Sequence, residues 1–410
     1  MRTVASRSVI APLGLAMLAV LAGCGKVSRE STSAGGGPVR RLAPVAAQGA
    51  VSLTTRNTTR LGGQDSAADA AGVARAVYPG LTPETRPRAV VLVNARDWPA
   101  ALAASVLASA PTSAPLLYSD GEAISNLTRE TLLAMHPTGL STLGGAQVIS
   151  IGTAAPLPAG LTVRHVPSSE PAATAAAVAA VLLSAVGGTP PREVIVVASD
   201  APRSMQMPAA SLAAESGAPI TYVTAAGVPA ATAALLASLG RPSMYVVDPA
   251  HVSPRAMAEL RRYGRVTPIA DSSREGVGPT TNSIALARFT DNGFGWGVKE
   301  PGHGLVFANA GRPLDAPAAA PLSATGDYGP LLLLERADQL PPALATYLGD
   351  IQPAYTQAPQ FRPVRGVYNH GWLIGDEQAI ASVTQAELDS LLEISPRRTS
   401  PEETAGAPPE

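Results

Sequence analysis

Short, uninterrupted runs of apolar residues alternate with alanine-rich segments along most of this 410-residue chain. The run VVLV at 90–93 is followed by AALAASVLASA at 100–110 and then by PLLY at 115–118. Apolar runs of this kind are typical of parallel strands that are covered on both faces. Because the alanine-rich segment between them is long enough for one crossover helix, the pattern predicts strand, helix and strand within a parallel sheet.

The same pattern recurs at 192–223 and again at 304–334. Val93 corresponds to Val197, 104 residues further on, and the third copy keeps this phase after an insertion of about six residues. Chance similarity between alanine-rich helices does not explain the agreement, because a third apolar run follows each copy in the same phase (147–152, 243–248 and 371–376). Repetition at one period indicates a single structural unit copied along the chain.

Each copy is also preceded by a segment that reads as a turn and then a helix. The expected order within a unit is helix, strand, helix, strand, helix and strand, which predicts the α/β fold class with right-handed crossovers. We predict three units of similar length, at 54–160, 161–265 and 266–394. With 46% apolar residues in the chain, units of about 100 residues can each bury a core.

The first residues are expected to be a targeting segment and not part of the fold. Residues 1–23 combine Arg2 and Arg7 with an apolar run that is too short to span a bilayer comfortably. The run ends in Leu-Ala-Gly before Cys24, which resembles a bacterial lipoprotein processing site, and Cys24 is the only cysteine in the chain. We therefore expect a signal peptide at 1–23 and a lipid on Cys24, palmitate included, that anchors the protein to the cell membrane on the side of the wall.

Two further segments lack any apolar period. Residues 24–53 are rich in Ser, Gly, Pro and Arg and are predicted to be a flexible tether. Residues 395–410 carry four prolines and no large apolar side chain, which predicts a disordered tail. Without a second cysteine, the exported protein must be stabilised by its core and not by disulfides.

The charge of the chain and its motifs exclude several classes of function. Thirty basic and thirty-one acidic residues give a net charge of −1, whereas a nucleic-acid-binding protein would show a strong basic excess. Lysine occurs only at Lys26 and Lys299, so any anion recognition would use guanidinium groups. No nucleophile elbow, P-loop or zinc-protease motif occurs, and the five histidines are scattered. We predict a binding protein without catalytic residues, cofactor or metal, and not an enzyme.

The polar residues of greatest interest follow the first predicted strand of each unit. In open parallel sheets, ligands bind at the carboxyl ends of the strands, where helix N-termini present free N–H groups. Each of these three loops offers an arginine and short polar residues, although such residues also serve as helix caps. The candidate binding residues are Asn94, Arg96, Asp97, Ser199, Asp200, Arg203, Asn309, Arg312 and Asp315.

The units resemble the cell wall-binding repeat 2 family. Its members show a segment like R-x-x-G-x-D-R-x-x-T-A, then a helix of the type D-A-L-A-A-S, and then G-A-P-I-L-L before the next strand. Here the first element begins at Arg60 and reaches Asp65, and the helix is AALAASVLA at 100–108. The last element is SAPLLY, GAPITY and YGPLLL in the three units, so the similarity covers about residues 54–394.

The sequence departs from the family pattern at two places. The acidic residue that opens the helix motif is kept only as Asp315, since Ala100 and Met205 stand at the other two positions. The second arginine of the first element is also lost, because Ser66 stands there. The resemblance implies three Rossmann-like modules about a pseudo-threefold axis. It also implies that grooves between the modules hold an anionic wall polymer without covalent bonds.

Two functions remain open. The first is a lipid-anchored protein that binds an anionic or glycan polymer of the envelope, such as a secondary wall polymer or a glycan linked to peptidoglycan. The alternative is a small-molecule-binding lipoprotein of a transport system, which would have two lobes around one hinged cleft instead of three equal units. In the insertion of the third unit, Phe294 and Trp296 would either stack on a sugar or fill a gap between units.

Overall fold

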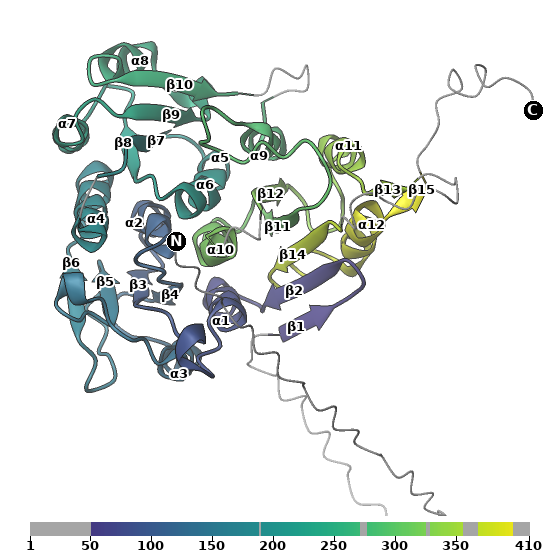
Figure 1. The fold of residues 1–410 in the computed structure, drawn as a ribbon, viewed down its shortest axis with the longest axis horizontal. Coiled ribbons are helices and arrows are strands. Elements are labelled where there is room, and N and C mark those ends of the chain that lie inside the picture. Colours follow the sequence, from purple (N-terminus) through teal and green to yellow (C-terminus); the bar gives the residue numbers. More distant parts are fainter. Residues whose placement is uncertain (1–50, 188–189, 271–276, 325–328, 356–367, 397–410) are drawn as a thin grey trace, which may run out of the picture. The chain divides into compact units, whose positions relative to one another are not determined.

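The computed structural model describes residues 51–187, 190–270, 277–324, 329–355 and 368–396, which are built around three parallel sheets (Figure 1). The predicted signal peptide, Cys24 and the predicted tether up to residue 50 lie outside these ranges, as do residues 397–410 of the predicted tail. Within the described ranges, no helix is sufficiently long and apolar to cross a membrane.

The first and second sheets are built alike, from four parallel strands each. The first has the order β4-β3-β5-β6, from β3 (Val90–Asn94), β4 (Leu116–Ser119), β5 (Val148–Ile151) and β6 (Val163–Val166). The second has the order β8-β7-β9-β10, from β7 (Glu193–Ala198), β8 (Ile220–Val223), β9 (Ser243–Val247) and β10 (Arg265–Ile269). The three apolar runs of each unit are thus strands, as predicted.

The fourth strand of each sheet has no counterpart among the predicted strands. In β6 the sequence is VRHV, and both Arg164 and His165 are exposed. An edge strand is covered by fewer neighbours than a central strand, so it needs no uninterrupted apolar run. The segments predicted as turn and helix are therefore strand, turn and helix.

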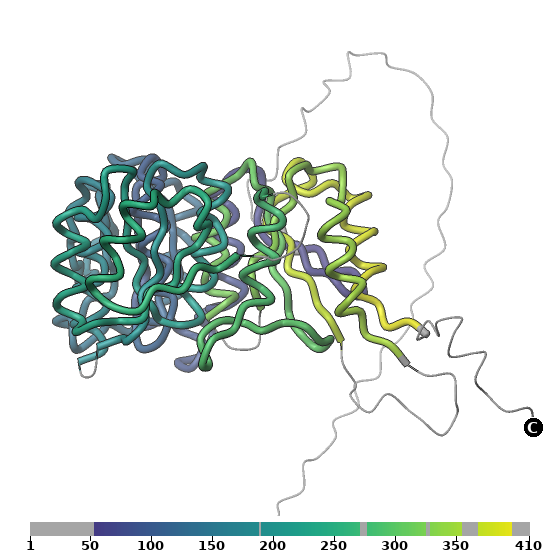
Figure 2. Tube along the Cα trace, turned by 90° about the horizontal axis from the view of Figure 1, so that it is seen from above, coloured from purple at the N-terminus to yellow at the C-terminus, as the bar shows by residue number. Residues whose placement is uncertain are grey.

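The third sheet takes its fourth strand from the opposite end of the chain. Its order is β12-β11-β14-β2-β1, from β11 (Gly304–Asn309), β12 (Leu331–Leu334), β14 (His370–Ile374), β2 (Thr58–Gly62) and β1 (Val51–Thr54). Strand β2 pairs in parallel with β14, and β1 adds an antiparallel edge. In Figure 2 the purple start of the described chain accordingly lies beside the yellow strand of its end.

The sheets therefore cross the predicted unit boundaries. The strand near the start of the second unit, β6, joins the first sheet, and β10, at the start of the third unit, joins the second sheet. Strand β2, at the start of the first unit, joins the third sheet and so closes the series. Strand β1 also begins at Val51, within the last residues of the segment predicted as a tether. The predicted boundaries describe the repeat in the sequence, whereas each sheet is shared between neighbouring repeats.

Helices flank the sheets, as the α/β prediction requires (Figure 1). Three linking helices each pack against the edge strand of the next sheet; these are α1 (Ser66–Val77), α4 (Pro171–Val186) and α9 (Pro279–Arg288). The crossover helices are α2 (Trp98–Ala104) with its 3-10 extension η2 (Ser105–Ala108), α5 (Arg203–Gln206), α6 (Pro208–Ser216) and α10 (Asp315–Ser323). The remaining helices are α3 (Asn126–Met135), α7 (Ala230–Ser238), α8 (Pro254–Leu260), α11 (Pro342–Asp350) and α12 (Ser382–Leu392).

Five short elements complete the described structure. They are the 3-10 turns η1 (Pro83–Thr85), η3 (Ser141–Leu143) and η4 (Pro249–His251), and the paired strands β13 (Ala354–Tyr355) and β15 (Ser395–Pro396). The confirmed fold class is thus α/β, with parallel sheets flanked by helices.

The crossover segments of the three units meet at three alanines. Ala108, Ala214 and Ala320 are each 106 residues apart, at most 4% exposed, and in contact with one another. Because a methyl side chain takes little space, three helix backbones can approach closely at this point. A separate, larger apolar core extends into all three sheets.

The insertion of the third unit fills a gap between units. Phe294 is 7% exposed and stacks on Tyr245 of β9, with the ring centroids 3.8 Å apart. The hydroxyl of Tyr245 donates to Asp291 at 3.1 Å, and the guanidinium of Arg265 pairs with the same carboxylate at 2.6 Å. Phe294 is thus part of a contact between the second and third units and is not available to stack on a sugar.

We predict that Ala214→Leu lowers the free energy of unfolding by about 1–3 kcal/mol, because the added methylenes must displace the neighbouring helices. Denaturant unfolding followed by circular dichroism measures this change. The matched control is Ala237→Leu on the exposed face of α7, which is expected to change the free energy by less than about 0.5 kcal/mol. Equal effects of the two substitutions would contradict the role of the three-alanine contact.

Candidate functional site

The predicted loop residues lie at the carboxyl ends of the first strands, where several of them stabilise the loops. Asn94 ends β3, and its Oδ1 accepts the N–H of Arg96 at 3.0 Å. Asn309 ends β11, and its Oδ1 accepts the N–H of Gly311 at 2.8 Å. Its Nδ2 donates to the carbonyl of Ala379 at 2.8 Å. The two asparagines thus form the same turn, and Asn309 has both ends of its amide engaged.

Asp97 is engaged as a helix cap. Its Oδ1 accepts the N–H of Ala100 at 3.1 Å and so caps α2. Its Oδ2 accepts the hydroxyl of Ser168, which lies in the loop before the linking helix α4. Asp97 therefore joins the first crossover helix to the segment that leads into the second unit.

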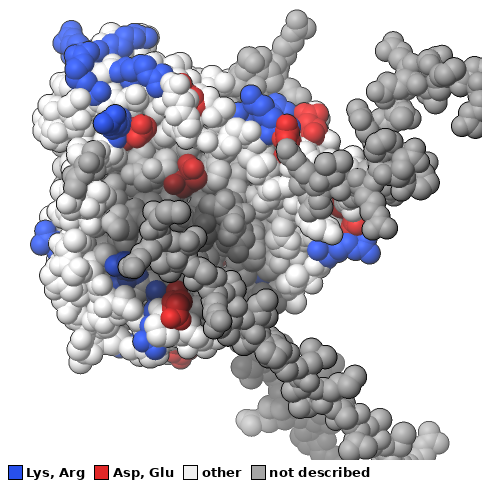
Figure 3. Space-filling view, viewed as in Figure 1, with Lys and Arg blue, Asp and Glu red and all other residues white. Residues whose placement is uncertain are grey.

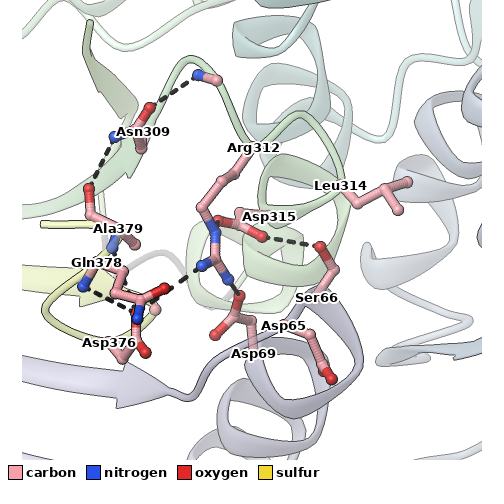
Figure 4. A network of polar contacts seen from close by, with 12 residues as sticks. Asp65, Ser66, Asp69, Asn309, Arg312, Leu314, Asp315, Asp376, Gln378 and Ala379 are labelled. Carbon is pink, nitrogen blue, oxygen red and sulfur yellow. Dashed lines mark hydrogen bonds and ion pairs between the residues drawn. The ribbon is translucent and has the colours of Figure 1, made fainter. Parts of the chain in front are cut away.

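Arg312 and Asp315 belong to a buried ion cluster between the two ends of the chain (Figure 4). The Nε of Arg312 donates to Asp315 at 2.8 Å, and one Nη donates to Asp69 of α1. Asp376, after β14, lies 3.9 Å from the other Nη. The carboxyl groups of Asp69 and Asp315 are both 0% exposed, whereas Arg312 keeps 20% of its side chain in contact with solvent.

The two buried carboxyl groups share one guanidinium, which sets their protonation. Burial, reinforced by the nearby charge of Asp315, raises the pKa of Asp69 to about 8. Burial also raises the pKa of Asp315, although Arg312 opposes the shift. Because both carboxyl groups pair with the one guanidinium of Arg312, a single proton on the two carboxyl groups leaves one negative charge that matches Arg312.

The remaining predicted residues are more accessible. Arg96, Asp200 and Arg203 are exposed, and Ser199 is half-buried. Arg203 begins the short helix α5. The nine predicted residues are thus divided among three loops, in which Asn94, Asp97, Asn309, Arg312 and Asp315 make structural contacts.

Sequence reasoning missed the buried role of Arg60. Its side chain on β2 is 3% exposed and donates to the carbonyls of Gly375, Asp376 and Ile380 at 3.1, 2.7 and 2.7 Å. It also donates to the Oε1 of Gln385 at 2.7 and 3.2 Å. The signal in the sequence was an arginine inside the short segment TTRLG, but its partners lie more than 300 residues away.

A groove lies beside the first sheet, between two helix N-termini. We call it the first groove; it has a volume of about 460 Å³ and lies between the start of α1, the end of β4 and the start of α3. One lining residue, Ala95, belongs to the predicted binding loop after β3. The polar residues of the lining are Asp65, Ser66, Tyr118, Ser119, Asp120 and Ser125. Its apolar part includes Ala123.

A second cavity lies at the equivalent place beside the third sheet. This third groove has a volume of about 450 Å³ and lies between the start of α9, the end of β12 and the start of α11. Its lining includes Gly278, Thr280, Glu335, Arg336, Gln339 and Ala343. Since α1, β4 and α3 correspond to α9, β12 and α11 in the repeat, the two grooves are copies of one feature.

Fold and grooves together define an α/β protein with three repeated sheets and equivalent grooves beside two of them. Residues 60–153 match the family model "Cell wall binding domain 2", so the family resemblance predicted from the sequence is confirmed for this segment. A comparison with curated proteins found no match.

Two solved structures share the fold. Cwp8 from Clostridium difficile is 17% identical with a TM-score of 0.61, and the match covers 83% of this chain and 52% of that one. Cwp6 from Clostridium difficile is 16% identical with a TM-score of 0.63, and the match covers 84% of this chain and 51% of that one. This chain thus spans about half the length of each of these proteins.

The Asp69 cluster predicts a specific pH dependence of stability. The folded protein retains a proton that unfolded Asp69, with an ordinary pKa of 3.8, releases. The resulting stabilisation is complete below about pH 4 and is lost as the pH rises through 8, with a slope of at most about 1.4 kcal/mol per pH unit. Asp69→Asn should remove this slope, which denaturant unfolding from pH 5 to pH 8 measures.

The control for this experiment is Asp65→Asn, because Asp65 is an exposed cap of the same helix and asparagine caps equally well. It should keep the pH dependence of the unchanged protein. If Asp69→Asn keeps it as well, the shared proton is not at this cluster.

Proposed function

We propose that this chain is an extracytoplasmic, lipid-anchored protein that holds a polymer of the cell envelope without covalent bonds. The single observation that carries the proposal is the pair of equivalent grooves in a chain that matches a cell wall binding domain. A polymer of repeating units presents the same chemical group many times, so repeated grooves can each bind one repeat. Joined sites then hold the polymer more tightly than either site alone.

The lining of the first groove favours sugar hydroxyls over anionic groups as its ligand. Asp65 and Asp120 place two carboxylates at the groove, and no lysine or arginine lines it. Hydroxyl groups of Ser66, Ser119 and Ser125 and the backbone N–H groups of two helix starts are of the type that binds sugar hydroxyls. We therefore assign the first groove to the glycan part of the polymer, and also its copy beside the third sheet, where Arg336 is paired with Asp338.

The number of sheets supports this proposal over a transport receptor. A small-molecule receptor with two lobes would have one hinged cleft between them. The described residues form three sheets joined through one core, with grooves beside separate sheets.

Substitutions that fill the grooves test the proposal. Protein without residues 1–24 should co-sediment with purified cell walls, and Ala123→Phe with Ala343→Phe should weaken this binding by about tenfold or more, because each phenyl group occupies one groove. The matched control carries Ala234→Phe and Ala237→Phe on the exposed face of α7. Unchanged binding of the groove variant would exclude the grooves as the site.

A second test concerns the lipid anchor on Cys24. Cys24→Ala removes the only acceptor for the lipid, so the protein should move from the membrane fraction to the medium or to the wall fraction. Metabolic labelling with palmitate followed by gel electrophoresis measures the loss of lipid directly. Label retained on the Cys24→Ala variant would contradict this mode of anchoring.

A further inference from the structure

Four arginines gather at the amino-end edge of the second sheet. Arg192 immediately precedes β7, Arg241 lies two residues before β9, and Arg261 and Arg262 lie in the turn that leads to β10. All four are exposed, and Figure 3 shows basic side chains gathered over α8 and β10. We call these four residues the arginine edge.

The strand register brings the four residues together. Glu193, Ser243 and Arg265 are paired neighbours at the starts of β7, β9 and β10. The N–H of Ser243 donates to the carbonyl of Arg192 at 2.8 Å. A Cβ on Gly264 would lie 2.1 Å from the carbonyl oxygen of Pro242, so the turns before β9 and β10 are in contact. With strands about 4.8 Å apart, the edge is a row roughly 10 Å long.

No ion pair neutralises the arginine edge in the described structure, although Glu259 lies near enough to Arg262 to interact with its charge. Among the described residues, none of its four guanidinium groups makes a hydrogen bond or ion pair, in contrast to Arg255 with Glu259 and Arg265 with Asp291. Two of the turns follow helices α7 and α8, whose C-terminal dipoles attract cations. This attraction accounts for one cation at each helix end, but not for a row of four in a chain of net charge −1.

We propose that the arginine edge binds the phosphodiester groups of an extended polyanionic polymer. Guanidinium groups pair with phosphate oxygens in a planar, bidentate geometry. A row of them fits a chain with repeated phosphates better than a single small anion.

A membrane surface and a folded protein fit the edge less well. Both would need apolar side chains beside the charges, but no large apolar residue between Arg241 and Arg265 is exposed. The inference rests on the wall-binding role proposed above and adds the chemistry of the ligand. Because the edge and the grooves lie at opposite ends of their strands, different stretches of one long polymer would occupy them.

The experiment compares two triple variants of equal charge. The edge variant is Arg241→Gln, Arg261→Gln and Arg262→Gln, and the control is Arg75→Gln, Arg129→Gln and Arg164→Gln, which are exposed positions away from the edge. The probe is purified poly(glycerol phosphate), whose affinity is measured by calorimetry at about 50 and about 200 mM salt. The edge variant should bind about tenfold more weakly than the control and should show a smaller salt dependence.

Two outcomes would overturn the proposal. Equal affinity of the two variants would show that only net charge matters. If the edge variant binds phosphatidylglycerol vesicles more weakly than the control but binds the polymer equally well, the edge is a membrane-binding surface. The variant Ala123→Phe with Ala343→Phe is tested separately, by co-sedimentation with cell walls. The arginine-edge proposal and the groove proposal can therefore fail independently of each other.

Discussion

The pairing of β2 with β14 is the contact on which the arrangement of the three sheets depends. It joins two segments separated by about 310 residues, so its formation must offset a large loss of chain entropy. Arg60 supplies part of the compensation, because its buried guanidinium donates to three carbonyls and one side-chain amide at the other end of the chain. Helix α1 follows β2 and packs on both α10 and β4, so the same pairing links the third sheet to the first.

The ion cluster of Asp69, Arg312 and Asp315 closes the same junction. Burying two carboxyl groups and a guanidinium is costly unless their charges balance. One proton on the carboxyl pair provides that balance, in line with the pKa of Asp69, which burial raises to about 8. The family motif has an acidic residue at the start of the crossover helix, and this chain keeps it only as Asp315. Its contacts with Arg312 and Ser66 stabilise the junction between the two ends of the chain, so they account for Asp315 without a bound ligand.

The two proposed binding surfaces lie at opposite ends of the strands and differ in their chemistry. At the carboxyl ends, linking and outer helices begin beside the edge strands, and the two grooves lie between these helix starts. At the amino-end edge of the second sheet, the turns carry arginines without partners in the described structure. A rigid repeated scaffold thus presents two kinds of chemistry, one suited to sugar hydroxyls and one to phosphates.

The sequence by itself determined the α/β class, the three-fold repetition and nine of the twelve parallel strands in the three described sheets, because uninterrupted apolar runs report burial on both faces. It also located the loops at the ends of the first strands. Only the tertiary structure decided that β2 completes the third sheet and that Arg312 meets Asp69. Contacts between residues about 240 to 320 positions apart leave no periodic trace in one sequence. The same holds for the grooves, since their walls come from elements that are separate in the chain and adjacent only after packing.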